Sequence, residues 1–111
     1  MKKRKDRTLE AYMKAGAEMR LYKALGTKLA VDISLLIPAA DTDKLLRAMR
    51  KIDEVCSNAE DSMFKDYPQI SNEYLDVFYG SMNEKPRNKV DEKVLGLAKE
   101  AADGLFKGKR D

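Results

Sequence analysis

The chain has 111 residues, of which 37% are charged, and its 22 Lys and Arg outnumber its 19 Asp and Glu to give a net charge of +3. This length suits one domain with one core rather than two. The sequence holds no histidine and a single cysteine, Cys56. These counts exclude a Ser-His-Asp triad, a histidine metal site and an intramolecular disulfide, and they are compatible with a reducing, cytoplasmic location.

The charges are sorted along the chain. Residues 1–51 hold 13 Lys or Arg against 6 Asp or Glu, residues 52–84 hold 1 against 8, and residues 85–111 hold 8 against 5. The segments therefore carry net charges of +7, −7 and +3. This pattern predicts an electrostatic dipole that steers the molecule toward a charged partner or toward a second copy of itself.

We expect no contact with membranes. The most apolar stretch, residues 29–40, is about twelve residues long and contains Asp32, whereas roughly 20 apolar residues are needed to cross a bilayer. The basic start of the chain is not followed by the apolar run of a signal peptide. We interpret residues 1–111 as a single helical domain with flexible basic ends at 1–7 and 107–111.

The first predicted helix covers residues 8–37. Apolar and small residues recur there at alternating steps of three and four, which is the spacing of one helix face. They are Tyr12, Ala15, Met19, Tyr22, Gly26, Leu29, Ile33 and Leu36. Thr8 can cap the start of this helix, and Pro38 disfavours helical geometry at the residue before it.

Three further helices follow from the same reasoning. A second long helix is expected over 39–66, a short one over 71–79 with Ser71 as its cap and Gly80 as its end, and a fourth over 88–106. No stretch alternates in the manner of a strand. The predicted fold class is therefore all-α, a small elongated bundle of about four helices.

The first helix is the candidate for self-association. Its 30 residues extend about 45 Å, whereas a compact domain of this size is about 34 Å across. A 24-residue stretch of the second helix would reach only about 36 Å and would leave part of the seam uncovered. We therefore assign a candidate self-association seam, which consists of Tyr12, Ala15, Met19, Tyr22 and Gly26, and a homodimer is left open.

Two further contact sites are predicted on the surface. A basic ridge on the second helix, formed by Lys44, Arg47, Arg50 and Lys51, could follow a phosphate backbone or contact an acidic protein. Its alternative interpretation is an ordinary solvated helix face. Tyr79 is the candidate aromatic contact for a protein partner, because it points away from the face that Tyr74 and Phe78 share.

Catalysis is not expected. Cys56 lies on the apolar stripe of the second helix, which favours a buried, inert thiol over a nucleophile. The adjacent carboxylates Asp53 and Glu54, like Glu60 and Asp61, diverge by about 100° on a helix and cannot jointly clamp one metal ion. The glycines are scattered and form no phosphate loop. We therefore predict no enzyme activity, no cofactor and no metal.

The sequence favours a non-enzymatic interaction protein that binds a protein or nucleoprotein complex and modulates it. Small, charged helical proteins without motifs resemble those carried by phages and mobile elements, including inhibitors of nucleoprotein defence enzymes. This resemblance transfers no residue to a site. The alternative is a dimeric, basic accessory protein that binds nucleic acid through the basic ridge and the basic start of the chain.

Overall fold

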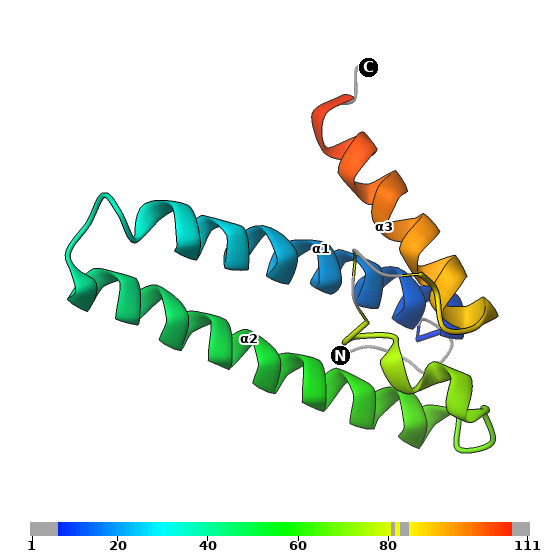
Figure 1. The fold of residues 1–111 in the computed structure, drawn as a ribbon. Coiled ribbons are helices and arrows are strands. Elements are labelled where there is room, and N and C mark those ends of the chain that lie inside the picture. Colours follow the sequence, from blue (N-terminus) through cyan, green and yellow to red (C-terminus); the bar gives the residue numbers. More distant parts are fainter. Residues whose placement is uncertain (1–6, 81, 83–84, 108–111) are drawn as a thin grey trace.

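The computed structural model describes residues 7–80, 82 and 85–107. Its elements are α1 (Leu9–Ile33), α2 (Ala39–Asp66), the 3-10 helix η2 (Asn72–Asp76) and α3 (Lys89–Lys107). Helices α1 and α2 form an antiparallel hairpin, and α3 crosses the start of α1 obliquely (Figure 1). The predicted all-α, elongated bundle is confirmed. The radius of gyration is 15.7 Å, whereas about 13 Å is expected for a compact chain of this length.

Helix α1 begins as predicted and ends four residues early. The Thr8 hydroxyl accepts a hydrogen bond from the backbone N–H of Ala11 at 3.0 Å, which confirms the cap. The helix ends at Ile33 rather than at residue 37. The reason lies in Pro38, because a proline ring clashes with the carbonyl four residues before it. Residues 34–38 form the turn that leads into α2.

Helices α2 and α3 lie where the sequence predicts them, and the third predicted helix is shorter than expected. Helix α2 has the expected bounds, and α3 is shifted by one residue. Instead of a helix over 71–79, the structure has five residues of 3-10 helix, η2, capped by the Ser71 hydroxyl. The carbonyls of Asp76 and Val77 accept hydrogen bonds from the buried Arg20 side chain, and the segment after η2 is a turn in which the backbone N–H of Gly80 donates to the carbonyl of Asp76.

The hydrophobic core occupies one half of the hairpin. Its fully buried side chains come from the start of α1, the end of α2, the segment after η2 and the start of α3. They are Tyr12, Met13, Ala17, Cys56, Met63, Val77, Phe78, Val94 and Ala98. We call this region the proximal half. Most of the aromatic residues after position 60 pack in or against this core.

A buried arginine joins three elements in the proximal half. The Arg20 side chain on α1 is 1% exposed and forms an ion pair with Asp91 on α3 at 2.7 Å. Its Nε donates to the carbonyl of Val77 at 3.0 Å. Gly80 is required beside it, because a Cβ there would lie 2.3 Å from the guanidinium carbon. The same side chain therefore fixes α1, α3 and the segment after η2.

Polar contacts also join the start of α1 to the end of α2 in the proximal half. Tyr12 on α1 donates through its hydroxyl to Asp66 at the end of α2 at 2.6 Å, and Arg7 pairs with the same carboxylate at 2.7 Å. Arg7 belongs to the predicted flexible start, yet it is anchored. Lys107, the first residue of the predicted flexible C-terminal end, is instead the last residue of α3. The other residues of the two predicted ends, 1–6 and 108–111, lie outside the described residues.

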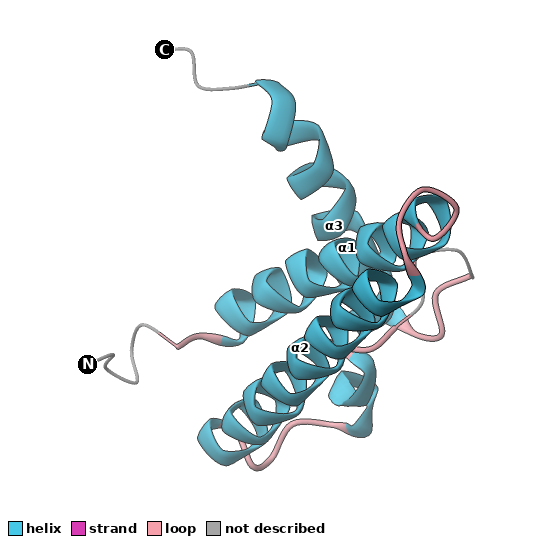
Figure 2. Ribbon diagram, turned by 90° about the vertical axis from the view of Figure 1, so that its left-hand side faces the viewer, coloured by secondary structure: helices cyan, strands magenta, loops and turns pink. Residues whose placement is uncertain are grey.

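The other half of the hairpin has no third helix. Helix α3 contacts the start of α1 and then diverges from it, so the stems beyond their middle pair only with each other (Figures 1 and 2). Between residues 21 and 55 a single residue, Ala30, is buried. A two-helix pair covers only one stripe of each helix, and the remaining apolar side chains stay exposed.

Candidate functional site

The turn of the hairpin carries the most exposed hydrophobic side chains of the described chain. We define residues 29–51 as the hairpin end. Leu35 is 88% exposed and Leu36 is 80% exposed in the turn between α1 and α2. Helix connections ordinarily use polar residues and glycine, and an exposed leucine gains almost nothing from burial on folding. The pair therefore forms an apolar surface that the fold itself does not use.

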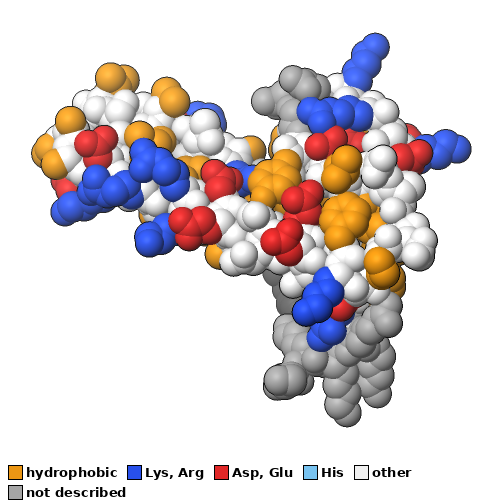
Figure 3. All heavy atoms as spheres, turned by 90° about the horizontal axis from the view of Figure 1, so that it is seen from below, with side chains coloured by type: hydrophobic (Ala, Val, Ile, Leu, Met, Phe, Trp, Pro, Cys, Tyr) orange, Lys and Arg blue, Asp and Glu red, His pale blue; other side chains and the backbone are white. Residues whose placement is uncertain are grey.

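The predicted basic ridge lies on the same hairpin end. All four of its residues, Lys44, Arg47, Arg50 and Lys51, are exposed on the side of α2 away from α1. Lys44 lies 3.6 Å from Asp41, and the other three form no ion pair within the described part of the chain. Figure 3 shows basic side chains along this arm of the molecule and hydrophobic side chains at its tip.

Acidic residues interrupt the ridge. Asp43 lies four residues before Arg47, and Glu54 lies four residues after Arg50, so both carboxylates share the outer face of α2 with the basic residues. A surface that follows a phosphate backbone uses a continuous basic patch. The mixed face instead resembles the polar rim of a protein interface, where charges of both signs surround an apolar centre.

Tyr79 is placed outside the hairpin end. Its side chain is 41% exposed while that of Phe78 is 1% exposed, as the helix geometry predicted. The Nζ of Lys23 lies 4.7 Å from the centre of the Tyr79 ring, which is a cation–π distance. The structure therefore does not bring Tyr79 together with the turn leucines, and its role as a protein contact stays a prediction.

The thiol is buried, as predicted. The Cys56 side chain is 0% exposed, and burial raises the pKa of its thiol, with a smaller opposing effect from Lys23. A nucleophilic cysteine has a lowered pKa and access to solvent. The described residues contain no group of three His, Cys, Asp or Glu side chains that could hold a metal ion.

The predicted self-association seam is divided between α2 and solvent. Tyr12 is buried and bonded to the end of α2. Gly26 also faces α2, because a Cβ there would lie 2.7 Å from the sulfur of Met49. Met19 is half-buried against the core, whereas Ala15 and Tyr22 are exposed. The five residues therefore do not present one continuous surface to a second copy.

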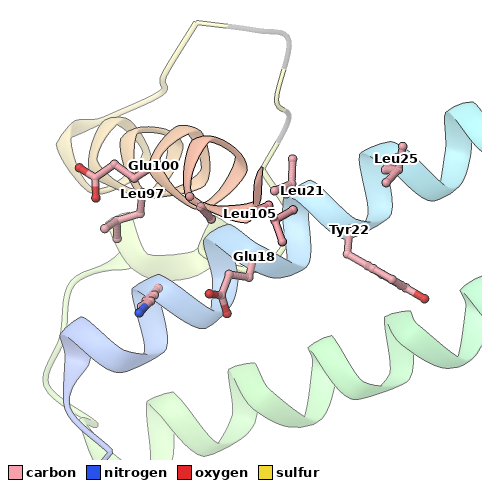
Figure 4. A pocket seen from close by; sticks show the side chains of 10 residues that line it. Glu18, Leu21, Tyr22, Leu25, Leu97, Glu100 and Leu105 are labelled. Atoms are coloured by element: carbon pink, nitrogen blue, oxygen red, sulfur yellow. The ribbon is translucent and has the colours of Figure 1, made fainter. Parts of the chain in front are cut away.

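A different face of α1 is left open. A groove of about 600 Å³ lies between α1 and the end of α3. Figure 4 shows the residues that line it; they are Lys14, Glu18, Leu21, Tyr22, Leu25, Leu97, Glu100, Ala101, Gly104 and Leu105. A smaller groove of about 150 Å³ lies between α1 and α2 and shares Tyr22 and Leu25 with the first. We call the larger one the α1/α3 groove.

Sequence reasoning found the basic ridge but missed the leucines of the turn. The predicted helix over residues 8–37 includes both leucines, and the sequence does not predict their exposure. The signal available was the proximity of Pro38, which ends α1 before Leu35.

Among the described helices, none has the combination of length and apolarity that a membrane span requires.

The comparisons with known proteins do not add to this description. No protein-family model, curated protein or solved structure gives a significant match to the chain.

Proposed function

We propose that the chain is a non-enzymatic interaction protein that docks its hairpin end onto a protein partner and thereby modulates that partner. The observation that carries this proposal is the pair of leucines, Leu35 and Leu36, at 88% and 80% exposure in the turn. Contiguous exposed apolar side chains with a polar rim are typical of protein interaction sites.

The position of the pair supports docking into an apolar pocket. The turn is five residues long and is held between helices of 25 and 28 residues. Helical stems limit the conformations of the turn, which lowers the entropy lost when it binds. The basic ridge lies on the adjoining part of α2 and would contact the surroundings of the pocket, where charge steers association and sets specificity.

A nucleoprotein partner, such as a defence enzyme that the protein inhibits, remains one form of this proposal. Direct nucleic-acid binding by a dimer is the second candidate, and one observation favours it: Arg47, Arg50 and Lys51 form no ion pair among the described residues. We give it second place because Asp43 and Glu54 share their face.

Affinity capture from the native host, with and without nuclease, tests the function. Wild-type protein is compared with the double variant Leu35→Ser/Leu36→Ser. Val55→Ser is the matched control, because Val55 is 51% exposed on α2 outside the hairpin end. We expect wild type and V55S to retain the same protein partner after nuclease treatment, and the double variant to lose it. Equal capture by the double variant would reject the assignment.

Charge reversal separates the two candidates. If the partner is a protein, Lys44→Glu/Arg47→Glu/Lys51→Glu should chiefly slow association, while the leucine variant should speed dissociation. If duplex DNA is bound directly, the reversal should nearly abolish binding, and log affinity should fall by about 0.9 per neutralised phosphate for each unit of log salt. Surface kinetics at two salt concentrations distinguish these results.

A further inference from the structure

Helix α3 is only half covered by its own chain. Val94 and Ala98 are fully buried against α1, yet Leu105, two turns beyond Ala98 on the same side of the helix, is 66% exposed. The cause is the divergence of α3 from α1, which leaves the end of α3 without a neighbouring helix (Figure 2). The apolar side of α3 therefore continues past the point where the chain covers it.

The facing side of α1 has the complementary deficit. Leu25 is 64% exposed on the wall of the α1/α3 groove. Figure 4 shows Leu21 and Leu25 on α1 across the groove from the end of α3, which carries Leu105. Each chain thus has an uncovered apolar face on α1 and an uncovered apolar segment at the end of α3.

One glycine of α3, Gly104, lies on the wall of the groove. Glycine in a helix interior costs about 1 kcal/mol relative to alanine. At Gly104, however, a Cβ would meet no atom within 4 Å. Gly104 lines the groove, so the space that it leaves is available to a helix from outside the chain.

The charges of the groove favour a second copy over a partner of one sign. Lys14 and Glu18 stand on the α1 side and Glu100 on the α3 side. None of the three forms an ion pair within the described residues, although Lys14 and Glu18 are four residues apart. A twofold arrangement offers each groove the same mixed set, so that a lysine of one copy can meet a glutamate of the other.

From these four observations we infer that the α1/α3 groove is the site at which two copies of the chain associate. The end of α3 from each copy enters the groove of the other, with Gly104 at the point of closest approach. The interface is independent of the turn leucines, which remain available to the partner under the proposed function. It differs from the predicted seam, of which it uses only Tyr22.

A pair of glycine substitutions provides the test. Gly104→Leu adds a side chain in the groove, and Gly96→Leu adds the same side chain on α3 outside the groove, where a Cβ also meets no atom within 4 Å. Both changes remove a helix glycine, so both variants should fold at least as stably as wild type. Sedimentation velocity from low to high micromolar concentration then measures the association of each variant.

We expect wild type and G96L to dimerise and G104L to raise the dissociation constant at least tenfold. Leu105→Asp should do the same. A mixture of Leu25→Cys and Leu105→Cys chains should form a mixed disulfide under mild oxidation, whereas a mixture of Leu35→Cys and Leu105→Cys should not. A wild-type protein that remains monomeric throughout, or a dimer that G104L and L105D leave unchanged, would overturn the inference.

Discussion

The same two helices behave differently at the two ends of the hairpin. In the proximal half, α1 contacts α2, α3 and the segment after η2, and its residues Ala17 and Arg20 are almost inaccessible. At the hairpin end α1 has α2 alone, and Leu29 and Val31 are 45% and 65% exposed. The contrast indicates that burial in this fold depends on packing against a third element rather than on helix length. The hairpin end is therefore the region whose exposed apolar side chains are available to a partner.

The largest expected effect is the loss of the buried arginine. Arg20→Ala removes the partner of Asp91, whose side chain is 5% exposed, and an unpaired buried charge costs about 3 to 5 kcal/mol. Chemical denaturation should show this loss. Arg20→Met/Asp91→Leu should recover only part of it, because the Val77 carbonyl would still lack its donor. Full recovery would show that Arg20 serves the ion pair alone.

The next largest effect is expected at two glycines of α1, one in the proximal half and one nearer the hairpin end. In Gly16→Ala, the added Cβ would lie 2.5 Å from the backbone oxygen of Val77, and overpacking of this kind costs about 1 to 3 kcal/mol. In Gly26→Ala, the new Cβ meets only the flexible end of Met49, and the gain in helix propensity is up to about 1 kcal/mol. The midpoint temperature of thermal unfolding should therefore fall for G16A and should be unchanged or higher for G26A. Equal losses would contradict the contrast between the halves.

A smaller loss is expected at the base of the hairpin. Tyr12→Phe removes the hydrogen bond to Asp66 while Arg7 keeps its own contact with that carboxylate. A hydrogen bond to a charged group contributes about 1.5 to 3 kcal/mol, and the remaining arginine contact places the expected loss at the lower bound. Urea denaturation of Y12F measures it. A variant as stable as wild type would show that the hydrogen bond between Tyr12 and Asp66 does not stabilise the proximal half.

The smallest effect concerns pH and Glu60. Partial burial, and then the neighbouring carboxylates of Asp61 and Asp76, raise the pKa of Glu60. Because the folded-state pKa is raised, the folded chain binds this proton more tightly than the unfolded chain. The resulting stabilisation is complete below the ordinary glutamate pKa and is lost as the pH rises through the raised pKa.

Glu60→Gln, which is neutral at every pH, should therefore be more stable than wild type at pH 7. The difference should shrink as the pH falls toward 4. Thermal unfolding of both proteins at several pH values measures this change. A difference that grows on acidification would mean that the Glu60 carboxylate has a favourable partner in the fold.

Much of the fold follows from local signals in the sequence. Thr8 and Ser71 act as caps because a hydroxyl can accept a backbone N–H wherever a helix begins. The bounds of α2 follow from the flanking residues Pro38 and Pro68. These effects involve neighbours within a few positions, and no knowledge of the tertiary packing is needed to see them.

The candidate site was less predictable, because it depends on which face of α1 the other elements cover. The spacing from Tyr12 to Gly26 indicated one seam, yet α1 is covered by α2 on one side and by α3 on another. Arg20 could not be recognised as a core residue, since its burial requires Asp91 and the carbonyl of Val77, 71 and 57 positions away. The exposure of Leu35 likewise depends on the tertiary arrangement, because α3 packs at the opposite end of α1 and leaves the turn uncovered (Figure 1).

Amide hydrogen exchange tests most directly the claim that the proximal half carries the stability and the hairpin end carries the binding. In the free chain, amides of residues 13–20 and 91–98 should exchange at least about tenfold more slowly than those of residues 24–33 and 40–50, because opening of a two-helix end costs less than opening of the core. With the captured partner bound, the added protection should fall within residues 29–51. Uniform protection along α1 and α2, or added protection only in α3, would contradict the account.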